Sequence, residues 1–369
     1  MKEFKVVLFT RELHNVLGGM ERQMLLLSKN LHLKGVSVTI VSLDLVPPTP
    51  FYDEEIGYIN FISIASNTSK VTATNVERIA RQFRLYLFLQ REKPDLGIAF
   101  MTGSYFYSRL PTLLRRIPLV LAERNSPAIY KLTSARKKRY LYFLAMFFAD
   151  LITVQFPRYR ELYPRILRRK IISIPNYISK VEIENQPSHL GTRFIAAGRF
   201  SFQKQFLMLI KAFAVFAKQN KESVLTIVGS GEEFDAMNKL IIDLNLSGRV
   251  VIKPPTNNLK ELFYEQDVLC VPSIWEGFPN ILAEALAAGI PALGFMDCDG
   301  VTDLIQDGVN GWKGGHHNDP DSLVDLFRRA DFDIASGVKF KPACQRSMSD
   351  YEDKKITALW LKTISLGEF

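Results

Sequence analysis

The sequence predicts an α/β protein with two doubly wound domains, each built on a parallel sheet. Short apolar, β-branched runs alternate with longer helical stretches along most of the chain, which is typical of parallel strands covered by helices. The chain has 369 residues, too many for one hydrophobic core. One stretch rich in Pro, Asn, Ser and Gly, IPNYISKVEIENQPSHLGT, separates two series of strands.

The strands of each series can be placed from their composition. The first series is expected at residues 4–10, 36–44, 96–102, 118–123 and 151–156. The second series is expected in RFIAAGRF, SVLTIVGSG, RVVIKPP, DVLCVPS and IPALGFMD. We therefore expect an N-terminal domain over 1–178, a C-terminal domain over 179–350, and a helix in 351–369 that packs back toward the first domain. Because open α/β sheets bind ligands at the carboxyl ends of their strands, the site is expected between the two halves.

Cysteine usage and apolar runs limit the class of protein. The three cysteines show no C-x-x-C spacing and the five histidines are scattered, so we expect neither a zinc site nor disulfides, and a reducing compartment. The first residues, MKEFKVVLFT, predict a buried strand rather than a signal peptide. The apolar run at 140–149 is shorter than the roughly 20 residues that span a bilayer and predicts a buried helix.

Charge is distributed unevenly. Residues 1–180 hold 28 Lys and Arg against 13 Asp and Glu, whereas residues 181–369 hold 19 against 25. The basic half is expected to face an anionic partner, with a solvated basic surface as the alternative. No nucleic-acid recognition motif accompanies the charge, so we expect no nucleic-acid partner. A predicted helix carries four arginines that could meet lipid headgroups or a pyrophosphate, namely Arg78, Arg81, Arg84 and Arg91.

The second half carries the more informative polar residues. Arg199 and Lys204 follow a strand and precede an apolar helix, where two cations could neutralise a diphosphate, although an exposed pair is the alternative. In EGFPNILAE, Glu276 precedes a helix and Glu284 lies within it. The free N–H groups of residues 278–280, at the start of that helix, are expected to receive an anion or a hydroxyl.

Two further motifs are weaker. Gly18 and Gly19 precede a helix after the first strand and would let backbone N–H groups approach a phosphate, although a plain loop is the alternative. The triplet Asp297-Cys298-Asp299 has the D-x-D pattern of some metal sites, but three residues are too few to indicate one. We assign the triplet to a loop and expect no metal.

Several motifs together carry a family resemblance. In their order and spacing, GGMERQ, AERNSP, IPNYI, GRFSFQKQ, VGSGEE, EGFPNILAE and DCDGVTDLIQDGVNGW resemble the bacterial family 4 glycosyltransferases of the GT-B fold. That group is retaining and depends on sugar nucleotides. AERNSP, at 122–127, is similar to the SERNDP-like strand end of one bacterial branch. The resemblance covers nearly the whole chain.

The resemblance implies a role for each matching residue. Arg199, Lys204 and Glu276 would be catalytic, the cations binding the diphosphate and Glu276 binding the transferred sugar, while Glu284 would bind ribose. The other donor-binding positions would be Gly18, Gly19, Gly198, Gly277, Phe278, Pro279 and Asn280. The positions near the acceptor or sugar, where related members place a histidine, would be Glu123, Arg124 and Asn125.

The resemblance also implies a reaction. The enzyme would need no cofactor or metal and would move a hexose or N-acetylhexosamine from a UDP-sugar to a lipid-linked or oligosaccharide acceptor. The product would belong to a bacterial lipopolysaccharide, capsule, exopolysaccharide or glycoprotein glycan. We expect a cytoplasmic protein that is peripheral at the inner face of the plasma membrane. Two alternatives stay open: a catalytically silent GT-B scaffold in a glycan assembly complex, and a GT-B sugar-nucleotide epimerase.

Overall fold

The structure, a computed structural model, divides the chain into two compact units. One unit is Met1–Tyr177 together with Asp353–Phe369, and the other is Ile178–Glu352. The residues that the structure describes are 3–13, 18–44, 57–65, 74–133, 136–137, 139–178, 181–183 and 190–365. Among them, no helix is both long and apolar enough to cross a membrane.

The first unit is built on a seven-stranded sheet in the order β3-β2-β1-β4-β5-β6-β7, with every pair of neighbours parallel. Its strands are β1 (Lys5–Phe9), β2 (Ser37–Ser42), β3 (Asn60–Ser63), β4 (Leu96–Phe100), β5 (Leu119–Ala122), β6 (Leu151–Val154) and β7 (Ile171–Ser173). The central strand β4 is buried along its whole length, as expected for a strand covered by helices on both faces.

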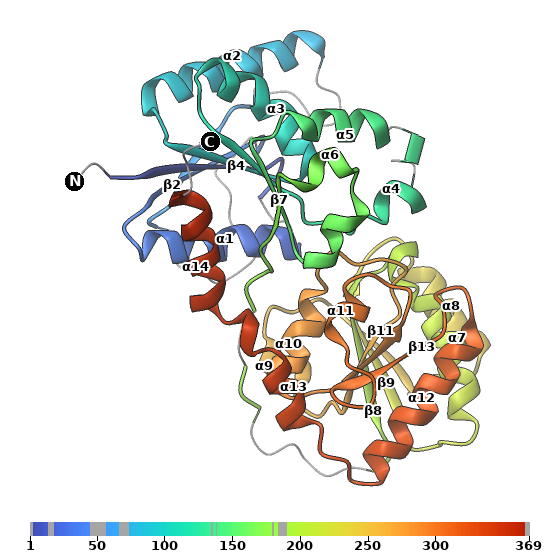
Figure 1. Ribbon diagram of the computed structural model, residues 1–369. Coiled ribbons are helices and arrows are strands. Elements are labelled where there is room, and N and C mark those ends of the chain that lie inside the picture. Colours follow the sequence, from blue (N-terminus) through green and yellow to red (C-terminus); the bar gives the residue numbers. More distant parts are fainter. Residues whose placement is uncertain are drawn as a thin grey trace. The chain divides into compact units, whose positions relative to one another are not determined.

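Helices cover both faces of this sheet (Figure 1). They are α1 (Gly19–His32), α2 (Asn75–Glu92), α3 (Met101–Leu114), α4 (Ile129–Leu132), α5 (Arg139–Phe147), α6 (Arg165–Arg168) and α14 (Asp353–Ser365), with the 3-10 helix η2 (Pro157–Leu162). Helices α1 and α14 contact each other and share a core that contains Met24, Leu31, Ile356 and Trp360. Because the connections from β3 onward run across the sheet in the opposite direction to the β1-to-β2 connection, right-handed crossovers place α2, α3 and α5 on the other face.

The second unit holds a six-stranded parallel sheet in the order β10-β9-β8-β11-β12-β13. Its strands are β8 (Arg193–Arg199), β9 (Val224–Ser230), β10 (Val250–Lys253), β11 (Val268–Val271), β12 (Ala292–Phe295) and β13 (Gly311–Gly314). Its helices are α7 (Phe206–Ala217), α8 (Phe234–Asp243), α9 (Leu259–Phe263), α10 (Asn280–Ala288), α11 (Val301–Leu304), α12 (Pro320–Ala335) and α13 (Lys341–Ser347), with the 3-10 helices η3 (Phe202–Lys204) and η4 (Ser349–Tyr351). Two doubly wound parallel sheets confirm the predicted fold class.

Helix α5 differs from its prediction. The apolar run at 140–149 was expected to form a buried helix, and that expectation is wrong, because Met146 is the one buried residue of α5. Its side chains Leu141 and Leu144 are 63% and 58% exposed. A mostly apolar helix is normally buried, but among the described residues α5 turns only the side with Met146 fully into the unit.

Candidate functional site

A lysine and a carboxylate meet at the carboxyl edge of the second sheet. Strand β8 ends at Arg199, and η3 then brings the Lys204 ammonium to 2.6 Å from the Glu276 carboxylate. Gly198 makes this approach possible, since its φ is +152° and a Cβ at this position would lie 3.1 Å from Cε of Lys204. The Lys204 and Glu276 side chains are 20% and 10% exposed, so their charges interact with little screening by water.

The Glu276 carboxylate is also fixed from the side of β11. The Ser273 hydroxyl donates a 2.6 Å hydrogen bond to the same Oε1 atom that pairs with Lys204. Two further bonds tie η3 to this loop, because the Gln203 amide donates to the Trp275 carbonyl at 2.7 Å and the Ile274 N–H donates to the Gln203 carbonyl at 2.9 Å. Ser273 was not singled out from the sequence, although a polar residue ending a buried strand three positions before Glu276 was a usable signal.

The Gly-Phe-Pro turn leads directly into α10. Pro279 is the N-cap of this helix, and Asn280 is its first residue. The expectation that the N–H groups of 278–280 all receive a ligand is wrong at Pro279, because proline has no amide hydrogen. Phe278 is buried against the Tyr351 ring, with centroids 5.6 Å apart, so its side chain anchors the turn. Glu284 is buried within α10.

The loop after β12 packs closely against this turn. Gly300 has a φ of +73°, and a Cβ there would lie 2.9 Å from Cδ of Pro279 and 3.1 Å from the Glu276 carbonyl oxygen. Only glycine fits both the left-handed backbone and the close approach. Cys298 is fully buried, and burial, followed by the negative charge of Glu276, raises the pKa of its thiol well above the ordinary value. The loop therefore brings a neutral thiol, rather than a second charge, near Glu276.

Arg199 and the D-x-D triplet, the other polar positions predicted in this unit, have surroundings different from those of Lys204 and Glu276. Arg199 is exposed at the end of β8. In the D-x-D triplet, Asp297 accepts hydrogen bonds from the His317 N–H at 3.1 Å and pairs with its Nδ1 at 2.7 Å. Within the described residues, no group of three or more His, Cys, Asp or Glu side chains is arranged to hold a metal ion.

In the first unit, the two glycines predicted to bind the donor, Gly18 and Gly19, lie at the start of α1. Gly18 is the N-cap with extended backbone, and Gly19 is the first helical residue. The Glu21 carboxylate occupies the space that a Cβ on Gly18 would need. The start of α1 therefore already faces a negative charge, which competes with any phosphate that approaches it.

The acidic and basic residues after β5 point into the protein. Glu123 accepts hydrogen bonds from the N–H groups of Arg124 and Asn125, both at 3.1 Å, and from the Tyr130 hydroxyl at 3.0 Å. Burial raises the pKa of Glu123. Asn125 is half-buried, and of the three predicted positions it is the one with side-chain surface left for a ligand.

Arg124 links the ends of three strands to the last helix. Its guanidinium donates to the Ile174 carbonyl at 2.8 Å, to Asn176 Oδ1 at 3.3 Å and to Thr153 Oγ1 at 3.1 Å. The guanidinium also lies over the Trp360 ring of α14, 5.4 Å from its centroid. Burial lowers its pKa to about 10, which leaves it charged at neutral pH. Arg124 is therefore a buried structural residue, which we call the Arg124 brace because it links the ends of these strands to α14.

Comparison with known proteins defines the class. The model "Glycosyltransferase Family 4" matches residues 17–179 and the model "Glycosyl transferases group 1" matches residues 183–330, so the two together cover most of the chain. With the two parallel-sheet units, these matches show that the chain belongs to the family 4 glycosyltransferases of the GT-B fold. The predicted family and the predicted enzyme class are confirmed.

Individual relatives are distant but cover nearly the full length. An uncharacterized glycosyltransferase of Haemophilus influenzae is 25% identical, over 93% of this chain and 95% of its own. An α-1,4-N-acetyl-D-galactosaminyltransferase of Campylobacter jejuni, named for an undecaprenol-diphosphate-linked glycan acceptor, is 24% identical over 94% and 95% of the two chains. The solved structure of Anabaena HepE with UDP and glucose superimposes with a TM-score of 0.80, at 16% identity over 99% and 100%, and shows the same fold.

Proposed function

We propose that the protein transfers a hexose or N-acetylhexosamine from a UDP-sugar, with retention of the anomeric configuration, to a lipid-linked or oligosaccharide acceptor. The glycan formed would be part of a bacterial cell surface. The observation that carries this proposal is the contact between Lys204 and Glu276 at the carboxyl edge of the second sheet, reinforced by Ser273. Ligands of open α/β sheets bind at this edge.

Each charged group has a defined role in the proposed reaction. Lys204 and Arg199 bind the diphosphate and stabilise the negative charge that grows on it as the glycosidic bond breaks. Glu276 accepts hydrogen bonds from hydroxyls of the transferred sugar, and Glu284 accepts them from the ribose. Phe278 and Asn280 offer backbone N–H groups to sugar or phosphate oxygens. These two cations supply the positive charge, so we propose that the reaction needs no metal and no cofactor.

Retention without a protein nucleophile follows from a front-face displacement. The bond between the anomeric carbon and the β-phosphate oxygen breaks, and the acceptor oxygen bonds to the same face of that carbon. The acceptor's proton passes to the departing phosphate, so no separate general base is required. The protein contributes positioning and charge stabilisation.

The acceptor is proposed to be lipid-linked because of two observations. The C. jejuni relative is named for an undecaprenol-diphosphate-linked acceptor. The first half of this chain also carries a large excess of basic residues, which suits an anionic acceptor or an anionic surface. We place the enzyme at the inner face of the plasma membrane, as a peripheral protein.

Sugar-nucleotide turnover tests this function. The purified protein is incubated with a panel of UDP-, GDP- and TDP-sugars, with and without a synthetic prenyl-diphosphate-linked saccharide, and products are identified by mass spectrometry and NMR. Transfer from a UDP-sugar with a retained anomeric configuration is expected. An inverted product contradicts the mechanism, donor conversion without acceptor indicates an epimerase, and no conversion of any donor indicates a silent scaffold.

A further inference from the structure

Helix α2 presents an apolar row to solvent. The row consists of Val76, Ile79, Phe83 and Leu87, which are 77%, 70%, 61% and 46% exposed. Their spacing of three and four residues places them on one side of the helix. At 1.5 Å per residue, the row is about 16 Å long. Single exposed apolar residues are ordinary on a protein surface, but an aligned row of four large ones indicates an interaction site.

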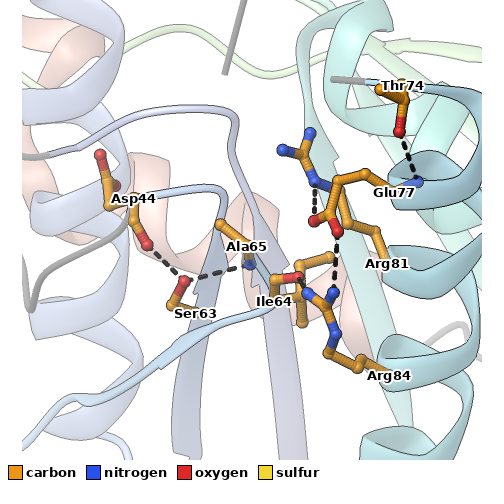
Figure 2. A network of polar contacts seen from close by, with 8 residues as sticks. All are labelled: Asp44, Ser63, Ile64, Ala65, Thr74, Glu77, Arg81 and Arg84. Carbon is orange, nitrogen blue, oxygen red and sulfur yellow. Dashed lines mark hydrogen bonds and ion pairs between the residues drawn. The ribbon is translucent and has the colours of Figure 1, made fainter. Parts of the chain in front are cut away.

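Two arginines of α2, Arg81 and Arg84, do not lie on the side of the apolar row. Figure 2 shows Glu77 bonded to both Arg81, at 2.9 Å, and Arg84, at 3.0 Å. Arg84 also donates to the Ile64 carbonyl at the end of β3. The expectation that Arg81 meets lipid headgroups is wrong, because Arg81 is buried and pairs with Glu77 of its own helix. Arg84 also fastens α2 to the residue that follows β3.

The apolar row continues across two further helices on the same face of the sheet. Helices α2 and α3 are joined by a 2.9 Å hydrogen bond from the Gln82 amide to the Tyr107 carbonyl, and α3 and α5 by the rings of Phe106 and Tyr142, 5.9 Å apart. The exposed apolar residues of these three neighbouring helices are together called the apolar helix face: Val76, Ile79, Phe83, Leu87, Leu110, Leu113, Leu114, Leu141 and Leu144.

The charges of the segment that holds α3 and α5 are almost all positive. Residues 101–149, which contain α3 and α5, hold nine Lys and Arg and one acidic residue, Glu123. Glu123 is buried. Exposed cations of this segment, such as Arg116 and Lys137, therefore accompany the apolar side chains of α3 and α5, with no exposed carboxylate in that segment to repel an anion. Apolar side chains bordered by cations are the composition of surfaces that bind anionic lipid interfaces.

We propose that the apolar helix face docks on an anionic lipid bilayer, with its Leu, Ile and Phe side chains inserted among the acyl chains and the bordering Lys and Arg at the phosphates. Docking would bring the enzyme to a membrane-linked acceptor. The proposal rests on the proposed function only for this purpose of docking, not for the docking itself. Docking through side chains of α2, α3 and α5 leaves the Lys204 and Glu276 edge, which belongs to the other unit, chemically unaltered.

Vesicle flotation of the full chain tests the proposal. The wild type is expected to float with vesicles of equal phosphatidylglycerol and phosphatidylcholine at low salt, and to bind pure phosphatidylcholine more weakly. The triple variant Ile79→Gln, Phe83→Gln, Leu87→Gln is expected to lose about tenfold or more in partition coefficient, since each side chain loses a favourable transfer into the apolar phase. The matched control is Val215→Gln, Ile242→Gln, Phe332→Gln, three exposed apolar residues of the second unit.

The outcomes separate docking from catalysis. Equal flotation of the two triple variants, or no flotation of the wild type, overturns the proposal. If the α2 variant changes from dimer to monomer with no effect on flotation, the face instead binds a second copy of the chain. Transfer to a short-chain, water-soluble acceptor is measured in parallel. If that activity fails while flotation depends on α2, the proposed function is wrong and the docking surface stands.

Discussion

The Lys204 ammonium lies 2.6 Å from Oε1 of Glu276, and the Ser273 hydroxyl donates to the same oxygen at 2.6 Å. One carboxylate oxygen of Glu276 thus contacts both Lys204, which is proposed to bind the donor diphosphate, and the hydroxyl of Ser273, which follows β11. A diphosphate that recruits Lys204 leaves Ser273 as the group that keeps this oxygen in place. Glu276 can then turn its hydrogen-bonding capacity to the sugar without losing its orientation.

This arrangement makes Ser273 a positioning residue. Because a hydrogen bond to a charged group contributes roughly 1.5–3 kcal/mol, Ser273→Ala is expected to lower kcat/KM by about ten- to a hundredfold. The KM for the donor is expected to change less than kcat. Ser201→Ala is the matched control, since its hydroxyl bonds only weakly, at 3.5 Å, to the Arg199 carbonyl. Equal kinetics of the two variants would remove the positioning role.

The close packing of Gly300 predicts a stability difference between two glycines with the same φ. Gly300 and Gly308 both have a φ of +73°, but a Cβ on Gly308 meets nothing within 4 Å. Gly308→Ala is expected to cost about 1–2 kcal/mol for the left-handed backbone alone. Gly300→Ala is expected to cost about 1–3 kcal/mol more through the contact with Pro279. Urea unfolding measures both, and equal costs would contradict the packing described.

The roles of Arg124 and Asn125 can be separated by experiment. Arg124→Met leaves the buried Ile174 carbonyl and Asn176 side chain without their donor, so a loss of about 3–5 kcal/mol in unfolding free energy is expected. Asn125→Ala, at a half-buried position, is expected to leave stability within about 1 kcal/mol and to change the acceptor KM. Thermal unfolding and acceptor titration give the two readouts. A stable Arg124→Met protein would show that the brace is dispensable.

The three cysteines are expected to be inert in the folded protein. Burial raises the thiol pKa of Cys270 and Cys298 well above the ordinary value, and that of Cys344 to about 12. Raised pKa values keep the thiols protonated, so reaction with a disulfide reagent should be negligible from pH 7 to pH 9 and should require unfolding. Urea should release three equivalents. One rapidly titrating thiol in native protein would contradict the burial of these side chains.

The sequence was sufficient to predict the fold because the strand signals are local. Strand β1, at Lys5–Phe9, and strand β4, at Leu96–Phe100, lie inside the predicted runs 4–10 and 96–102. The solvent exposure of α5 was not predictable, because a mostly apolar helix has the local pattern of a buried one, and the exposure of Leu141 and Leu144 within the described structure depends on how the unit packs. The contact of Arg84 with the Ile64 carbonyl depends on the position of β3 beside α2, which no local pattern shows. The Glu77–Arg81 pair, by contrast, is a local contact between residues four apart on one helix.

The candidate site was predicted unevenly for a similar reason. Lys204 and Glu276 lie 72 positions apart, and their contact follows from the adjacency of β8 and β11 in the sheet. Motif order brought both residues into the prediction, but the contact itself required three dimensions. Gly300 acts through packing against the Glu276 turn, which no local pattern indicated. Ser273 acts through its hydrogen bond to Glu276, and its place shortly before Glu276 was the one local signal.

Donor binding by a Lys204 variant tests the central claim most directly. Calorimetric titration of the wild type with the UDP-sugar that it turns over is compared with Lys204→Ala and with the control Lys211→Ala, an exposed lysine of α7. Loss of a charge-assisted contact to the diphosphate predicts about tenfold or more weaker binding for Lys204→Ala and an unchanged affinity for the control. Equal donor affinity in all three proteins would contradict the assignment of this edge as the sugar-nucleotide site.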